Sequence, residues 1–227
     1  MSLRFLAVLA LGMASTAAAQ DAYKLEKLAD APPAELAPAI KETLQAGGHR
    51  VLDGQGAPLV DVWLRKATPA SGAPDGPKGA ILYPVLAEGE LIGVAKYAAE
   101  GYDYRDQSIV PGVYTLRYGL QPVNGDHLGV SVNRDYVLLV LAAKDTDAAV
   151  LDRKKLEKQS AEAVGTTHPG VLLLLAAPEK LPEGPTMIHD EGLNTWGAIL
   201  TLPLQVEGQA DAVPLPLQLT VVGAKTD

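Results

Sequence analysis

The sequence predicts a mainly β protein, an antiparallel β-sandwich with two peripheral helices. Apolar residues recur with a period of two in at least seven short segments, and turn-forming Gly and Pro residues separate these segments. Two other segments have a helical period, and they do not alternate with the strands, which argues against a parallel βαβ sheet. Two sheets packed face to face are a natural way to bury one side of many short strands.

The first nineteen residues have the pattern of a secretory signal peptide. Arg4 supplies the positive charge, residues 5–13 supply a short apolar core, and Ala17, Ala18 and Ala19 supply the small side chains of a cleavage site. The apolar run is too short to span a bilayer. We therefore expect residues 1–19 to be removed, and the mature protein to be periplasmic or extracellular.

Composition excludes several classes of function. The net charge is −8, and losing Arg4 with the signal would make it −9, whereas nucleic-acid binding needs clustered Lys and Arg. The chain has no Cys, which rules out disulfides, thiolate metal sites and a thiol nucleophile. After the signal, the most apolar run is residues 171–177, which has the length of a strand and predicts no membrane span.

Residues 20–50 are expected to form a lead-in and a helix. The first part, residues 20–31, shows no clear period. Two prolines at positions 32 and 33 then open a helical stretch, and a pair of glycines at positions 47 and 48 ends it. The apolar face of this helix consists of Leu36, Ile40 and Leu44.

Residues 51–227 are expected to form a single β-sandwich domain. Its first strand, near residues 60–65, alternates Val60, Val62 and Leu64 with more polar positions, which predicts one face toward water. Residues 67–79 are a loop by composition. A hairpin then joins residues 81–86 to residues 91–97 through a short turn that contains Gly.

The later strands of this domain follow the same reasoning. Tyr114, Leu116 and Tyr118 share one face of a strand over residues 113–121. Residues 136–141 are apolar on both faces, which predicts a central strand. A helical insert is expected near residues 151–164, because sparse apolar positions accompany a charged face. Three strands follow at residues 170–176, 196–206 and 213–222, and Pro203, Pro214 and Pro216 place the last two at sheet edges.

The run at residues 51–64, Val-Leu-Asp-Gly-Gln-Gly-Ala-Pro-Leu-Val-Asp-Val-Trp-Leu, resembles the opening of prealbumin-like domains, also called carboxypeptidase-regulatory-like domains. Residues 110–116, Val-Pro-Gly-Val-Tyr-Thr-Leu, are similar to a later segment of that family. The resemblance covers residues 51–121. It implies a seven-stranded sandwich, prealbumin-like or immunoglobulin-like, which usually acts as a non-catalytic accessory or binding module. It assigns no ligand and no functional residue.

A segment rich in Tyr and Asp, residues 97–107, is the best candidate for a binding surface. Tyr rings stack on sugars or peptide planes, and Asp and Arg side chains form hydrogen bonds at the rim of such a site. The alternative is that the Tyr rings close over the core. With the 124–128 turn, the candidate binding residues are Tyr102, Asp103, Tyr104, Arg105, Asp106, Asp126 and His127.

A divalent metal site is an alternative use of the loop residues. His127, His168 and His189 all lie beside turn residues, where loops could gather at one end of a sandwich. His and carboxylate side chains together bind zinc and similar ions. None of the histidines has the short spacing of a motif on one helix or strand, so ordinary surface His is the competing interpretation.

Catalytic signatures are missing from the sequence, and no catalytic residue is assigned. Residues 129–133 begin like a nucleophile elbow but end in Asn and continue into a strand. Arg117 and Arg134 are expected to tie loops down through ion pairs with Asp106, Asp126 or Asp135.

These observations favour an exported, non-catalytic binding or accessory module that needs no cofactor. Its partner would be a protein, a peptide or a carbohydrate, and not a nucleic acid. One alternative is a metal-dependent exported enzyme that uses the three histidines. Another is an envelope scaffold or assembly protein that offers edge strands to a partner.

Overall fold

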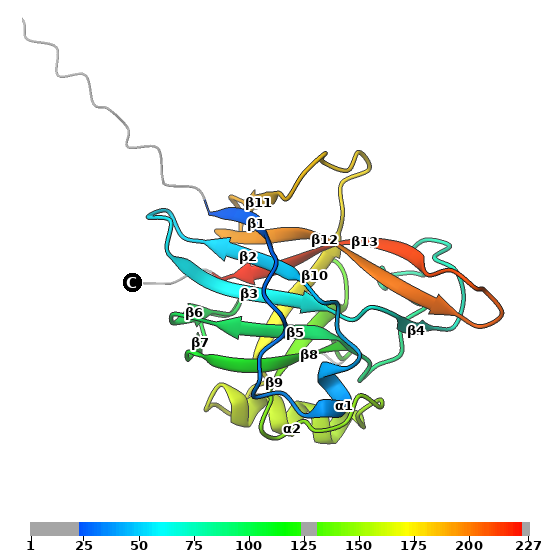
Figure 1. Ribbon diagram of the computed structural model, residues 1–227, viewed down its shortest axis with the longest axis horizontal. Coiled ribbons are helices and arrows are strands. Elements are labelled where there is room, and N and C mark those ends of the chain that lie inside the picture. Colours follow the sequence, from blue (N-terminus) through cyan, green and yellow to red (C-terminus); the bar gives the residue numbers. More distant parts are fainter. Residues whose placement is uncertain (1–22, 124–130, 224–227) are drawn as a thin grey trace, which may run out of the picture.

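The computed structural model of the chain describes residues 23–123 and 131–223 (Figure 1). The expected signal peptide, residues 1–19, and the 124–128 turn with Asp126 and His127 lie outside the described residues. The described part is mainly β with two helices, as the sequence predicts. Neither helix has the length and apolar character needed to cross a membrane.

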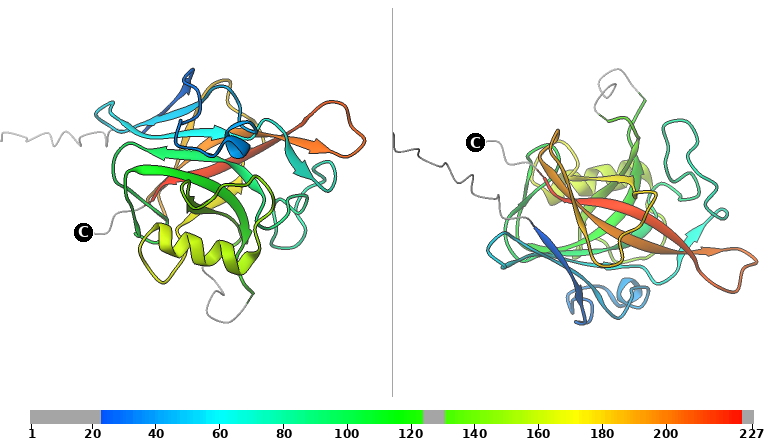
Figure 2. Two further views of the ribbon diagram at one scale, coloured as in Figure 1. Left: turned by 60° about the horizontal axis from the view of Figure 1, so that its bottom comes forward. Right: turned by 90° about the horizontal axis from the view of Figure 1, so that it is seen from above.

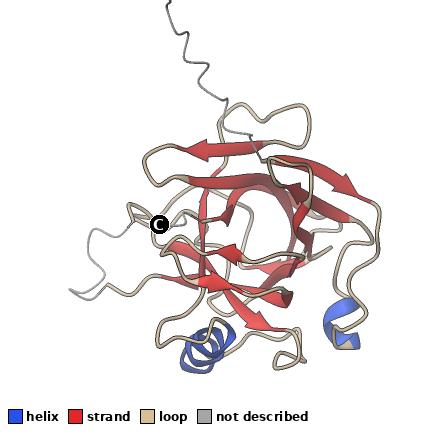
Figure 3. Cartoon of the chain, turned by 90° about the vertical axis from the view of Figure 1, so that its left-hand side faces the viewer, coloured by secondary structure: helices blue, strands red, loops and turns tan. Residues whose placement is uncertain are grey.

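Most strands belong to one continuous sheet that curls around the core (Figures 2 and 3). All of its pairs are antiparallel except the short parallel pair of β4 (Thr68–Ala70) with β12. A separate hairpin joins β6 (Gly101–Tyr102) to β7 (Ser108–Ile109). The order of the large sheet is β1 (Lys24–Leu28), β2 (Gly48–Leu52), β3 (Pro58–Leu64), β5 (Leu91–Tyr97), β8 (Gly112–Leu120), β9 (Asp135–Leu141), β10 (Val171–Ala176), β13 (Val213–Val222), β12 (Thr195–Val206) and β11 (Met187–Asp190).

Strand β10 joins the two halves of the sheet. Its first residues, Val171 to Leu173, pair with β9, and its last residues, Leu174 to Ala176, pair with β13. The strands before and after this point therefore belong to one large curled sheet and not to two clearly separate sheets. The inner faces of both halves share one apolar core, which includes Val62, Tyr97, Leu116, Leu139, Leu200, Leu217 and Leu219.

The outer face of β3 is buried, although the alternation of its residues predicts that this face is exposed to water. Trp63 is only 2% exposed, because Leu36 and Ile40 of the preceding segment pack against it. The Trp63 indole Nε1 donates a hydrogen bond of 2.9 Å to the carbonyl of Asp30. The N-terminal segment crosses this face, so the polar alternation of β3 does not report exposure.

The N-terminal segment also differs from its expected secondary structure. Residues 24–28 form β1, which pairs with β2, and helix α1 spans only Pro38–Lys41. Leu36, Ile40 and Leu44 are buried together as the helical stripe predicts. Gly48 begins β2 instead of ending a helix, and a Cβ atom there would lie 2.4 Å from the carbonyl oxygen of Val62.

The expected hairpin forms only on its second side. Residues 91–97 are β5, but residues 81–86 contain no strand. The Asp135 carboxylate accepts hydrogen bonds from the backbone N–H groups of Leu82, at 2.7 Å, and Tyr83, at 3.0 Å. These donors are therefore satisfied by a side chain and not by a strand partner. The loop expected at residues 67–79 contains β4, and its other residues form no strand.

The last two long strands are not at the edges of the sheet. β13 lies between β10 and β12, and β12 lies between β13 and β11. Pro214 and Pro216 precede the residues of β13 that pair with β10. Pro203 lies between the parts of β12 that pair with β11 and with β4. The prolines therefore occupy stretches with a partner on one side, which tolerate a missing N–H.

Helix α2 (Arg153–Ala163) and the central position of β9 are both as the sequence predicts. The Asp152 carboxylate caps the helix by accepting hydrogen bonds from two backbone N–H groups in its first turn. Leu156 packs against Leu138 and Val140, whose side chains lie on the outer face of β9. Figure 3 shows that α2 lies outside the curled sheet.

A buried ion pair joins β8 to the loop that follows β9. The Arg117 guanidinium binds both oxygens of Asp145 at 2.7 and 2.8 Å, and the two side chains are 0% and 1% exposed. Arg117 also donates to the carbonyls of Gly89, Asp147 and Ala149. The expected partners of Arg117 were therefore wrong, although it does hold a loop. Arg134 donates to the Gln121 carbonyl at 2.8 Å.

We expect Arg117→Met to lower the free energy of unfolding by about 3–5 kcal/mol, because it leaves the Asp145 carboxylate buried without its cation. Urea unfolding followed by circular dichroism measures this loss. The control is Arg153→Met, which removes the partly exposed pair with Glu157 and should cost less than about 1 kcal/mol. Equal losses in the two variants would contradict this account.

Candidate functional site

A cavity lies on the outer face of the sheet beside α2. Its volume is about 710 Å³. Tyr136 of β9 and Val171 and Leu173 of β10 line it from the sheet. These three positions lie on the outer face, since Val137, Leu172 and Leu174 belong to the inner core. The helix contributes Lys154, Glu157, Lys158, Ala161 and Glu162.

One end of the cavity is formed by the turn at residues 103–107, which Asp103 holds in place. Asp103 is fully buried, and its Oδ1 atom accepts hydrogen bonds from the backbone N–H groups of Arg105, at 2.8 Å, and Gln107, at 3.0 Å. Its Oδ2 atom accepts from the N–H of Val171 at 3.1 Å. The turn is therefore attached to the start of β10, and Tyr104 and Arg105 lie at the cavity.

The same turn binds the loop that follows α2. The Gln107 side chain donates to the carbonyl of Pro169 at 2.9 Å and accepts from the Thr166 hydroxyl at 2.7 Å. His168 lies in this loop and also lines the cavity. The structure thus brings together Tyr104, Arg105 and His168, which the sequence assigns to two different kinds of site.

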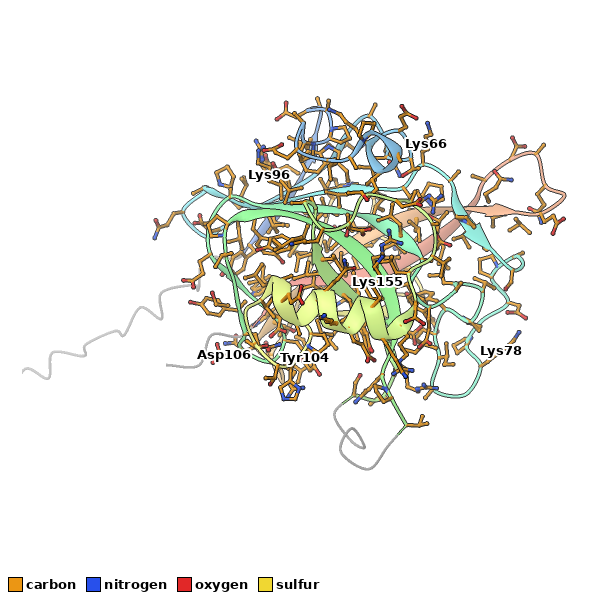
Figure 4. The ribbon with its side chains drawn as sticks, turned by 90° about the horizontal axis from the view of Figure 1, so that it is seen from below. Lys66, Lys78, Lys96, Tyr104, Asp106 and Lys155 are labelled. Carbon is orange, nitrogen blue, oxygen red and sulfur yellow. The ribbon has the colours of Figure 1, made fainter. Side chains whose placement is uncertain are left out.

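The other candidate binding residues have different places. Asp103 supports the turn. Asp103, Tyr102 and Asp106 are not among the residues that line the cavity. The Tyr102 hydroxyl donates to Glu100 at 3.1 Å. Asp106 has a φ of 64°, in the left-handed region that Asp tolerates better than most residues. Figure 4 shows Tyr104 and Asp106 near one end of α2.

The two Tyr rings at the cavity stay neutral at physiological pH. Burial raises the pKa of the Tyr104 hydroxyl, and the neighbouring Arg105 opposes this shift. Burial also raises the pKa of Tyr136, whose hydroxyl donates to the Leu120 carbonyl at 3.0 Å. The rings therefore offer apolar faces and hydrogen-bonding hydroxyls, without negative charge.

The histidines proposed for a metal site do not share one location. His168 is at the cavity. The His189 ring of β11 stacks on the Trp196 ring, with 4.4 Å between the ring centroids, and its Nε2 atom lies 3.3 Å from Asn194 Oδ1. His127 lies outside the described residues. Within residues 23–123 and 131–223, no group of three or more His, Cys, Asp or Glu side chains is placed to hold a metal ion.

Sequence reasoning missed the helical and sheet walls of the cavity. The charged face of the helix near residues 151–164 is evident in the sequence, and so is the apolar run at residues 171–177. Nothing in either pattern indicates that the two lie side by side. Comparisons with protein-family models, with curated proteins and with solved structures find no match.

Asp103→Asn tests the role of the turn. An amide has only one acceptor oxygen, so its NH₂ group would face either the donors that bind Oδ1 or the donor that binds Oδ2. We therefore expect the free energy of unfolding to fall by about 2–3 kcal/mol. The control is Asp53→Asn, whose Oδ1 atom binds the same pattern of backbone N–H groups in an exposed turn, at 2.9 and 2.8 Å. This control should lose less than about 1 kcal/mol. A small loss in both variants would contradict the anchoring role.

His49 gives a pH-dependent prediction. Burial lowers the pKa of this ring, and the charge of Lys27 lowers it further, below the usual 6.5. His49 therefore takes up a proton more readily in the unfolded chain than in the folded protein. Its contribution to the free energy of unfolding is complete above pH 6.5 and is lost as the pH falls through 6.5 toward the folded pKa. His49→Gln should reduce this loss in urea unfolding.

A direct measurement of His49 is available from an NMR titration of its ring. We expect a folded pKa below 6.5 in the unmodified protein and a higher value in Lys27→Gln, because that variant removes the neighbouring charge. A folded pKa at or above 6.5 in the unmodified protein would show that the prediction is wrong.

Proposed function

We propose that this protein is an exported, non-catalytic binding module, and that its ligand occupies the cavity between α2 and the 103–107 turn. The observation that carries the proposal is the convergence of Tyr104, Arg105 and Tyr136 on one cavity of about 710 Å³. A cavity of this volume, with apolar and aromatic walls and a few polar groups, is typical of small-ligand sites.

Two of the three carboxylates that line the cavity are held by the protein's own groups, which favours binding over catalysis. Asp135 is 2% exposed, and Oδ1 accepts from the Tyr118 hydroxyl at 2.6 Å in addition to the Tyr83 N–H. Glu157 accepts from Arg153 Nε at 2.9 Å. A general acid or base needs a position from which it can exchange a proton with a substrate. These two carboxylates instead hold the protein's own groups.

The walls of the cavity suit a ligand with a flat or apolar face. Tyr104 supplies a partly exposed ring, and Ala161 leaves space on the helix side. A short peptide or a carbohydrate would place such a face against the ring. The resemblance of residues 51–121 to prealbumin-like sandwich domains agrees with an accessory role, as does the expected export to the periplasm or the medium.

The test is a ligand-observed NMR screen of sugars, short peptides and small aromatic compounds. Compounds that bind should lose about tenfold in affinity with Tyr104→Ala, because about 1.4 kcal/mol of ring contact is removed. They should also be displaced by Ala161→Trp, which fills the cavity. Tyr102→Ala is the matched control, since Tyr102 does not line the cavity.

Two results would contradict the proposal. One is a screen in which no compound binds. The other is a set of bound compounds whose affinity is unchanged in both Tyr104→Ala and Ala161→Trp.

A further inference from the structure

Other groups of the protein already engage the carboxylates around the cavity. Asp135 accepts three hydrogen bonds from Leu82, Tyr83 and Tyr118. Glu157 binds the guanidinium of Arg153, and Glu162 lies 4.0 Å from the ammonium of Lys158. Glu157 and Glu162 therefore each face a cation of the same helix, whereas the donors that bind Asp135 are neutral groups.

Two positive charges at the cavity have no such partner. Among the described residues, no carboxylate oxygen lies within 4.0 Å of the charged groups of Arg105 or Lys154. Both side chains belong to exposed residues that line the cavity. The site as a whole therefore presents unpaired cations, although the net charge of the chain is −8.

The two cations lie toward opposite ends of α2. Lys154 is in the first turn of the helix, whereas Arg105 belongs to the turn that binds the loop after the helix. A helix rises about 1.5 Å per residue, so the length of α2 after Lys154 is about 14 Å. Ala161, Val171 and Leu173 are among the apolar residues that line the same cavity. The cavity therefore combines apolar wall residues with one cation toward each end of α2 that has no carboxylate partner.

We infer that the ligand is an elongated amphipathic carboxylate, with an apolar or aromatic body along the β10 wall and its acid group beside Arg105 or Lys154. This inference rests on the proposed function and adds the chemical class of the ligand. A guanidinium presents a planar set of donors that matches a carboxylate, which makes Arg105 the stronger of the two partners.

A second cavity provides an internal contrast. Its volume is about 310 Å³, and prolines including Pro77, Pro84 and Pro178 line it. The charged residues in its wall are acidic, Asp75 and Glu179. A carboxylate group would therefore not raise the affinity of an apolar compound for this second cavity. A preference for the acid form distinguishes the two cavities.

The experiment uses three compounds with one body: 4-phenylbutanoate, its primary amide, and 4-phenylbutylamine. Titration calorimetry should give the acid at least about fivefold higher affinity than the amide, and the amine the lowest. Added salt should reduce the preference, because exposed charges are screened. The preference should disappear in the double variant Arg105→Gln/Lys154→Gln, while the affinity for the amide stays the same.

Lys155→Gln is the matched control for charge removal. Lys155 is the next residue of the same helix (Figure 4). It is exposed and is not among the residues that line the cavity. This variant should keep the preference for the acid. A preference that falls equally in Lys155→Gln and in the double variant would overturn the inference, since it would report net charge alone.

Other outcomes separate this inference from the proposed function. Equal binding of the acid and the amide, lost in Ala161→Trp, would overturn the anionic ligand and leave the binding module in place. A preference that survives Arg105→Gln/Lys154→Gln would also overturn the inference. If none of the three compounds binds, the inference fails, and the broader screen decides the proposed function.

Discussion

The divided pairing of β10 gives the large sheet its curled shape. One strand pairs first with β9 and then with β13, so the sheet turns at this strand and both of its halves close over one core. The inner side chains of β10, Leu172 and Leu174, are buried in that core. Its outer side chains, Val171 and Leu173, lie beside α2 and the 103–107 turn. These outer side chains, α2 and the 103–107 turn all contribute residues to the wall of the cavity.

Buried aspartates attach the irregular segments to the sheet. Asp135 accepts hydrogen bonds from the backbone of residues 82 and 83. Asp145, in the loop after β9, binds Arg117 of β8. Asp103 joins its own turn to the first residue of β10. Each carboxylate accepts several hydrogen bonds, so its charge is compensated in place. These bonds attach the loops to the sheet in a chain that has no disulfides.

The site illustrates how far local patterns reach. Tyr104 and Arg105 could be selected from the sequence because aromatic and charged residues gather in one polar segment. His168 could be selected only as a loop histidine. Their meeting depends on the contact of Gln107 with Thr166, which are 59 positions apart, and no periodicity encodes a contact of that kind. The role of Asp103 was hidden for the same reason, because its partner Val171 is 68 positions away.

The amino-acid pattern was enough to predict the mainly β class, the long strands β8, β9, β12 and β13, and the position of α2. These elements follow from repeats of two and of about four residues, which reflect the geometry of a single segment. The tertiary structure decided which faces are covered. Trp63 is buried because the N-terminal segment crosses it, and residues 81–86 remain irregular because Asp135 satisfies their backbone. Such outcomes depend on which distant segments meet, and side-chain alternation along one strand carries no information about its neighbours.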